Sequence, residues 1–140
     1  NGAGILTIAK GSGLASIGVV GGSTPPASIS ITGTGAITLN SVTTVGTQAY
    51  ASAITLAADT VLTTTDSNVT QSSTLNGAHA MTVAIGSGTY TQTDAIGNTT
   101  PITNFTLTAG TYNASNITLS GNFTKTAGTF NAGTGTVTFV

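Results

Sequence analysis

The chain has 140 residues, of which only 4% are charged. Its ionisable side chains are few, and arginine, glutamate and cysteine do not occur: the cations are Lys10 and Lys125, and the anions are Asp59, Asp66 and Asp94. This composition excludes a basic nucleic-acid-binding surface, which needs clustered Lys and Arg, and it excludes disulfides and thiolate metal sites.

The remaining composition favours β-structure over disorder. Disordered chains combine low hydrophobicity with high net charge, whereas here the mean hydropathy is +0.34 and the net charge is −1. Thr, Val, Ile, Tyr and Phe favour pleated, half-buried surfaces. We therefore predict a single all-β domain over residues 1–140. No apolar stretch approaches the roughly 18 residues of a membrane span, and we expect a mature subunit or a fragment of a longer repetitive protein.

The first 45 residues alternate short apolar strands with Gly and Pro. An apolar strand is predicted at 5–8, and a second one within 14–20, closed by Gly21-Gly22. The segment 23–26 contains Pro25-Pro26 and should form a loop or an edge, because proline donates no backbone hydrogen bond. Period-two alternation with small polar residues then predicts an inward set on either side of a bend at 33–35. Its members are Ile29, Ile31, Ile37 and Leu39.

The stretch from 46 to 83 continues this alternation. Ile54 and Leu56 should face one side and Thr55 the other. We expect a corner at 57–60, after which Val61-Leu62 resumes the apolar line. Asn76-Gly77 is a turn signal. The next inward set is predicted at Met81, Val83 and Ile85.

The end of the chain contains a repeat. Residues 109–114 read A-G-T-Y-N-A, and 18 residues later 127–132 read A-G-T-F-N-A. A unit this small cannot bury its own apolar face, so it must stack on a neighbour, as the units of a β-solenoid do. Coils of ~20–25 residues at ~4.8 Å spacing would give about six coils and a rod of roughly 30 Å. An antiparallel β-sandwich, similar to a pilin that polymerises by strand donation, remains the alternative, because sandwiches also show short, regularly spaced strands.

Two stretches resemble a known group of proteins. The middle one reads T-Q-A-Y-A-S-A-I-T-L-A-A-D-T-V-L-T and then L-N-G-A-H-A-M-T-V, and the terminal one reads A-G-T-F-N-A-G-T-G-T-V-T-F. Over residues 46–83 and 105–140, about half of the chain, they resemble the β-helical repeats of filamentous-haemagglutinin-like and autotransporter-like bacterial surface proteins. The resemblance implies a right-handed parallel β-helix, export to the cell surface or beyond, and a structural or adhesive role without catalysis.

The titratable residues suggest no reaction centre. His79 has no Ser–Asp partner signature around it and is expected in a turn or on the surface after Asn76-Gly77. The aspartates lack the Gly-Gly-x-Gly-x-Asp pattern of calcium-binding β-rolls, and Asp59 is expected to make a corner turn. Glycoside hydrolysis would need paired carboxylates on one face. We therefore expect no enzyme activity, catalytic residue, metal site or cofactor.

Three surface patterns leave binding alternatives open. Six Asn-x-Ser/Thr sequons offer glycosylation sites on an uncharged surface: Asn68, Asn98, Asn104, Asn113, Asn116 and Asn122. Repeated Thr-x-Thr pairs could form an outward ladder that orders water, as in ice-binding solenoids. An aromatic residue follows Gly-Thr at Tyr90, Tyr112 and Phe130; an outward row could bind sugar rings, but an inward core row is the expectation.

Both ends of the chain carry apolar strands. Unpaired strand edges pair readily with other strands, so we predict contacts to other copies or to flanking repeats. The residues expected to make them are Ile5, Leu6, Ile8, Val137, Phe139 and Val140. The sequence thus predicts an extracellular fibre, adhesin stalk or surface-filament subunit, with a host surface or a carbohydrate as a further partner. The alternatives are the strand-donating pilin and a solenoid that binds ice or carbohydrate.

Overall fold

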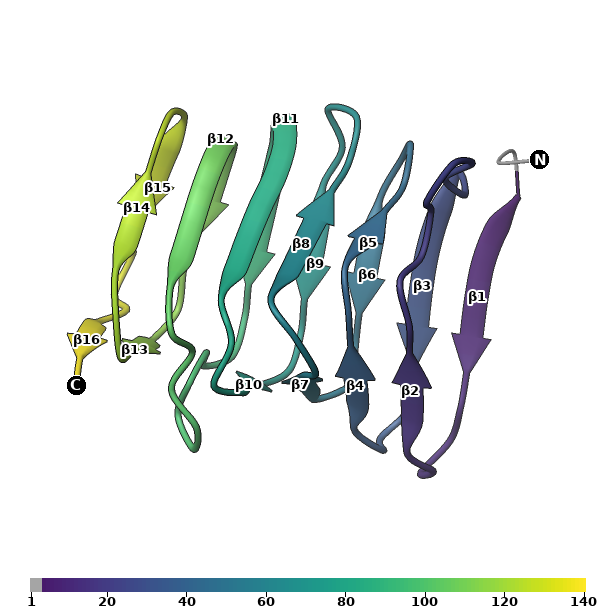
Figure 1. Ribbon diagram of the computed structural model, residues 1–140, viewed down its shortest axis with the longest axis horizontal. Coiled ribbons are helices and arrows are strands. Elements are labelled where there is room, and N and C mark those ends of the chain that lie inside the picture. Colours follow the sequence, from purple (N-terminus) through teal and green to yellow (C-terminus); the bar gives the residue numbers. More distant parts are fainter. Residues whose placement is uncertain (1–3) are drawn as a thin grey trace.

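The computed structural model describes residues 4–140, which form an all-β coil without a helix (Figure 1). Its strands stack in parallel, in about six turns, which is the arrangement of a β-solenoid. Every strand pair runs parallel, including the pairs at the two ends of the described chain. The predicted coil stack is therefore confirmed. The antiparallel sandwich, and with it the pilin-like alternative, is wrong.

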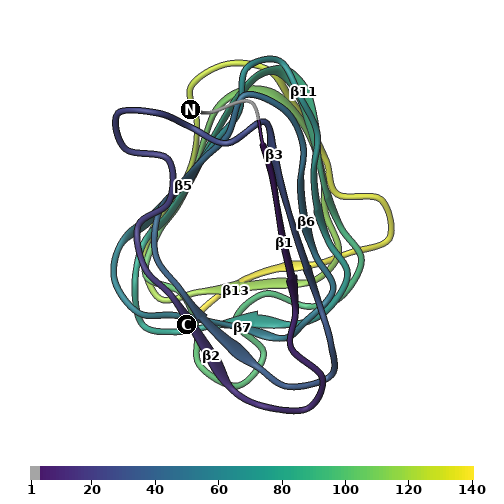
Figure 2. The same ribbon diagram turned by 90° about the vertical axis from the view of Figure 1, so that its right-hand side faces the viewer.

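Seen along its axis, the coil has three sides, which we call faces A, B and C (Figure 2). Face A contains β1 (Ile5–Ala9), β3 (Ser28–Thr32), β6 (Gln48–Tyr50), β9 (Val69–Gln71), the C-terminal halves of β11 (Met81–Gln92) and β12 (Phe105–Asn113), and β15 (Thr129–Asn131). Face B contains β2 (Ala15–Ile17), β4 (Ile37–Leu39), β7 (Ile54–Leu56), β10 (Leu75–Asn76), β13 (Ile117–Leu119) and β16 (Val137–Phe139). Face C contains β5 (Val42–Thr43), β8 (Thr60–Thr63), the N-terminal halves of β11 and β12, and β14 (Phe123–Lys125).

The coil is right-handed. In Figure 2 the N-terminal end faces the viewer, and the chain passes clockwise from β1 through β2 toward the side of β5 as it recedes. Parallel crossovers are right-handed because right-twisted strands return to their sheet most easily in that sense. The handedness expected from the resemblance is thereby confirmed.

The alternation of buried and exposed residues along each strand determines which side chains form the core. Ile54 and Leu56 are buried and Thr55 is exposed, as predicted, and the inward set in β11 is buried as well. On face B the inward residues form one continuous column through five coils, since each pairs with its counterpart in the next coil. The column consists of Ile37, Ile54, Leu75, Ile96 and Ile117, all at most 2% exposed.

One inward assignment is wrong. Val61 does not continue the apolar line with Leu62, because it faces outward and is 38% exposed, whereas Leu62 is buried. The chain enters β8 with Thr60 already facing inward, where its hydroxyl donates to the carbonyl of Ala58 at 2.9 Å. The alternation therefore begins one residue earlier than the apolar pattern suggested.

The terminal repeat stacks in register. Phe105 lies beside Phe123, Tyr112 beside Phe130 and Asn113 beside Asn131, so the two near-copies are consecutive coils. The Ala-Gly-Thr element recurs because the corner between faces C and A needs a backbone conformation that side chains rarely adopt. Gly110 has a φ of +90°, and a Cβ there would lie 2.6 Å from the carbonyl oxygen of Gly88.

Candidate functional site

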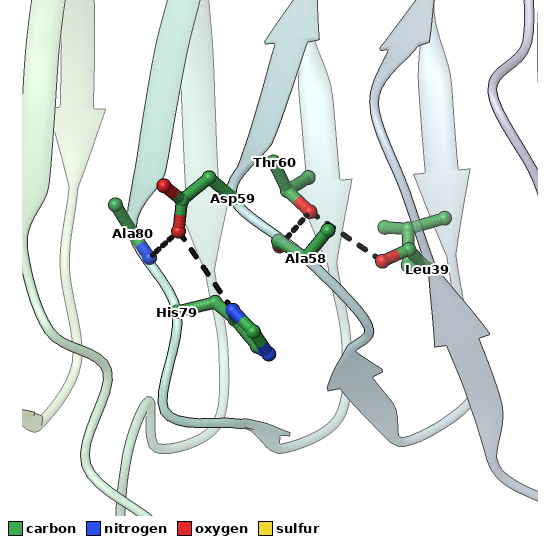
Figure 3. Close-up of polar contacts among 6 residues, drawn as sticks. All are labelled: Leu39, Ala58, Asp59, Thr60, His79 and Ala80. Carbon is green, nitrogen blue, oxygen red and sulfur yellow. Dashed lines mark hydrogen bonds and ion pairs between the residues drawn. The ribbon is translucent and has the colours of Figure 1, made fainter.

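The structure brings together two of the titratable residues that the sequence had left apart. Asp59 follows β7 and His79 follows β10, one coil further on, and both lie at the corner between faces B and C (Figure 3). His79 Nδ1 is 3.8 Å from Asp59 Oδ1. The side chains are 41% and 79% exposed, so water screens the pair.

The main contact of Asp59 is with the backbone of the next coil. The N–H of Ala80 donates to Asp59 Oδ1 at 2.9 Å (Figure 3). The expected corner exists at 57–59, but the carboxylate does not close its own turn. It satisfies a donor 21 residues later, just before β11, and so ties two coils together. His79 lies in the bend that follows Asn76-Gly77, where the turn was predicted, and Gly77 has a φ of +130°.

The hydroxyl next to this pair in the sequence is engaged elsewhere. A His–carboxylate pair can orient an imidazole for general-base catalysis, but it needs a nucleophile or a bound substrate within reach. The neighbouring Thr60 hydroxyl is buried and donates to the carbonyl oxygens of Ala58 and Leu39 (Figure 3). Within residues 4–140, no three His, Cys, Asp or Glu side chains gather as metal ligands would. The arrangement is suited to joining coils.

The other aspartates lie at separate corners and also bind backbone. Asp66 Oδ1 accepts the N–H of Ser87 at 2.8 Å, one coil further on. Asp66 has a φ of 52°, a conformation that Asp and Asn tolerate better than most residues. Asp94 Oδ1 accepts the N–H of the following residue, Ala95, at 2.7 Å. The carboxylates therefore stabilise turns and coil contacts at different places.

Several sequon asparagines join consecutive coils in the same way. The Oδ1 atoms of Asn68, Asn104 and Asn116 accept backbone N–H groups 18 to 21 residues later, at 2.8 to 3.0 Å. Asn113, the last residue of β12, accepts the side-chain amide of Asn131, the last residue of β15, at 2.9 Å. Asn98 and Asn122 are exposed. Glycosylation at the six sequons stays a prediction.

Sequence reasoning missed a buried polar ladder along face A. The tyrosine hydroxyls donate to glutamine Oε1 atoms: Tyr50 to Gln48 within one strand at 2.9 Å, and Tyr90 to Gln71 and Tyr112 to Gln92 across neighbouring coils. All these side chains are at most 5% exposed. The glutamine amides in turn donate to backbone carbonyls, so the ladder leaves no described buried side-chain polar atom unpaired.

Two of the three tyrosine–glutamine pairs follow one rule of register, whereas Tyr50 binds Gln48 of its own strand. Tyr90 pairs with Val69 of the preceding coil, and Gln71 stands two residues after Val69, within reach of the tyrosine hydroxyl. A glutamine two residues after the inward residue of one coil is thus followed by a tyrosine at the inward position of the next. After Tyr112 the corresponding residue is Ala114, and the next coil carries Phe130. The hydroxyl is thus present where its partner is present. This covariation within one chain could have been found from spacings of about one coil.

Burial raises the pKa of the three tyrosines above the ordinary value. Desolvation raises the pKa of Tyr50, Tyr90 and Tyr112, and the neighbouring tyrosine adds a smaller rise for the last two. Tyr90 and Tyr112 stack with ring centroids 4.8 Å apart, and Tyr112 stacks on Phe105 at the same distance. The aromatic row therefore faces inward, as expected, and Tyr90 and Tyr112 present no ring to a sugar.

The outer surface of face A is a dense array of small uncharged side chains. Its register aligns Thr89, Thr111 and Thr129 in one column. A second outward column runs through Thr70, Thr91 and Asn113. Thr89 and Thr91 form one of the Thr-x-Thr pairs of the sequence, whereas Thr111 and Thr129 are each followed two residues later by Asn.

The predicted contact residues lie at the two open ends of the described stack. Ile5, Phe139 and Val140 are 60 to 70% exposed. Leu6, Ile8 and Val137 are partly buried against the core and belong to its inward columns. At the C-terminal end Phe123 and Phe130 are likewise only partly covered. The apolar interior thus reaches both ends without a covering layer in residues 4–140.

Comparison with protein-family models, with curated proteins and with solved structures gave no match. Among the described residues, no helix is long and apolar enough to span a membrane.

Proposed function

We propose that this chain is a non-catalytic structural segment of an extracellular fibre or cell-surface filament, in which coils stack end to end. The observation that carries the proposal is the continuity of the interior: the same inward columns that join coils inside the molecule are uncovered at β1 and at β15 and β16. An exposed strand edge with apolar inward residues pairs readily with another strand.

A head-to-tail contact between copies would extend the existing register. Placing β1 of a second copy on β15, and its β2 on β16, continues the inward columns of faces A and B. Phe130 would lie next to Leu6 of that copy, and Phe139 next to its Ile17. Such a contact buries apolar surface and pairs backbone groups, as between the coils already present.

The surface chemistry suits a mechanical role. Only 4% of the residues are charged, and the carboxylates of Asp59 and Asp66 bind the backbone of the next coil. A surface with so few charges gives a free monomer little colloidal protection. The resemblance to filamentous-haemagglutinin-like and autotransporter-like proteins adds the expectation of export and of an adhesive or scaffolding role at a bacterial surface.

Sedimentation velocity at rising protein concentration tests the proposal. The wild-type chain should form species that lengthen with concentration. Phe139→Glu should suppress them, because it adds a charge to an inward column at the docking edge. Thr138→Glu, on the same strand but outward, is the matched control and should assemble nearly as the wild type does. A wild-type chain that stays monomeric up to millimolar concentration would refute end-to-end stacking.

A second candidate function is binding to ice through face A. The observation that favours it is the uncharged outward array with Thr89, Thr111 and Thr129 in register. β-branched side chains have few rotamers, so such an array is rigid. A thermal-hysteresis measurement on the wild type and on Thr111→Lys separates this activity from assembly.

A further inference from the structure

One inward column ends in a charge. On face C the strand register aligns six positions, one from each coil. Five of them are apolar, and the sixth, at the C-terminal end, is a lysine: Val20, Val42, Leu62, Val83, Leu107 and Lys125. Lys125 therefore occupies a core-facing position on the last strand of its face.

The lysine ammonium remains in solvent at this end of the stack. Lys125 is exposed, and its Nζ donates to the carbonyl oxygen of Gly128 at 3.1 Å. A further strand paired to β14 would cover this side chain and remove its charge from water. Burying an unpaired ammonium is strongly unfavourable, and inward-pointing charges are one means by which natural sheets prevent pairing at an edge.

The order of the strands explains why β14 needs such protection. Along the right-handed coil, β14 on face C comes before β15 on face A and β16 on face B. A second copy that pairs its β1 with β15 and its β2 with β16 therefore begins beyond β14. None of its described strands pairs with β14. Its first described residue on face C is Val20, which follows β2. Among residues 4–140 of the two copies, no strand then pairs with the outer edge of β14. Moreover, no carboxylate precedes Asp59 in the sequence, so the first coils of the second copy offer the ammonium no acidic partner.

We propose that Lys125 closes the edge of β14 to strand addition, so that a second copy docks through β15 and β16 only and the assembly stays linear. The part of this inference that concerns the docking of a second copy rests on the end-to-end stacking proposed above. The closing of β14 itself rests on the register and the charge, and it can be measured separately.

The test compares three variants by light scattering and negative-stain microscopy at equal concentration. Lys125→Val removes the charge from the inward position and should raise scattering several-fold, with bundled or branched particles. Thr124→Val makes a similar apolar change on the same strand but outward, and should behave as the wild type. Lys125→Arg keeps the charge and should also behave as the wild type.

The outcomes are distinguishable. If Lys125→Val and Thr124→Val scatter equally, or if Lys125→Arg associates as Lys125→Val does, the inference is overturned, whatever the wild type does. If the wild type alone fails to assemble, end-to-end stacking fails, and excess association of Lys125→Val still supports the closed edge. Far-UV circular dichroism of each variant verifies that the coil has formed.

Discussion

Removing one hydroxyl from the buried ladder should destabilise the whole coil stack. Tyr112 is fully buried and donates to Gln92 Oε1, and Gln92 is 5% exposed. Tyr112→Phe keeps the ring and its stacking on Tyr90 and Phe105 but leaves the glutamine oxygen buried without this donor. A buried polar group left unpaired costs about 1–3 kcal/mol, so we expect the free energy of unfolding to fall by about that amount.

A double-mutant cycle isolates the pair. Gln92→Leu removes the acceptor together with two amide contacts, to the carbonyl oxygens of Asp94 and Asn116 at 2.6 and 2.9 Å. With both changes present, the penalty of the unpaired oxygen disappears. The two effects should therefore be less than additive, by about 1–2 kcal/mol. Urea unfolding followed by circular dichroism measures all four proteins, and additive losses would refute the claimed coupling.

The same pair can be moved to the last coil, where the chain has Ala114 and Phe130. Ala114→Gln and Phe130→Tyr should each be neutral or destabilising alone. Together they should be more stable than the sum of the single changes, by about 0.5–1.5 kcal/mol, the usual net value of a hydrogen bond. If the stability of the double variant does not exceed the value expected from adding the two single effects, the observed covariation of glutamine and tyrosine is accidental.

Three further predictions concern the corners and the pH response. Gly110→Ala should lower the free energy of unfolding in urea by at least about 2 kcal/mol, since the residue has a φ of +90° and its new Cβ would meet the Gly88 carbonyl. Gly4→Ala is the control and should cost far less, because the space around Gly4 is open. Because burial raises the pKa of the tyrosines, the folded chain holds protons that the unfolded chain releases above pH of about 10. The tyrosine contribution to stability should therefore be constant below that pH and fall above it, and an unchanged urea midpoint between pH 9 and 11 would contradict this. Asp59→Ala should lose about 0.5–1.5 kcal/mol through the Ala80 N–H, while Asp59→Asn, which keeps an acceptor, should lose less.

The fold could be predicted from the sequence because the repeat and the alternation are local signals. The near-copies at 109–114 and 127–132 pair in register, and the Ile54 to Leu56 alternation has the predicted orientation. The alternation did not show which face of the coil each inward residue belongs to, because successive strands lie on different faces. Ile29 lies on face A, and Ile37, only 8 residues later, lies on face B.

The polar contacts between coils were beyond sequence reasoning because they depend on the length of each coil. Asp59 and His79 meet only because 20 residues close one turn at that corner, while other turns need 18 or 24 residues. The glutamine–tyrosine ladder has the same origin. Val61 was misplaced for a different reason: an apolar residue at an outward position carries no sign of its orientation, and such residues are common on protein surfaces.

Negative-stain electron microscopy of the purified wild-type chain at high concentration tests end-to-end stacking most directly. We predict unbranched rods one coil in width, with lengths in multiples of the roughly 30 Å that six coils span at about 4.8 Å per coil. A population of single-length particles, or of round particles, at every concentration would contradict this account of the chain as a stacking scaffold.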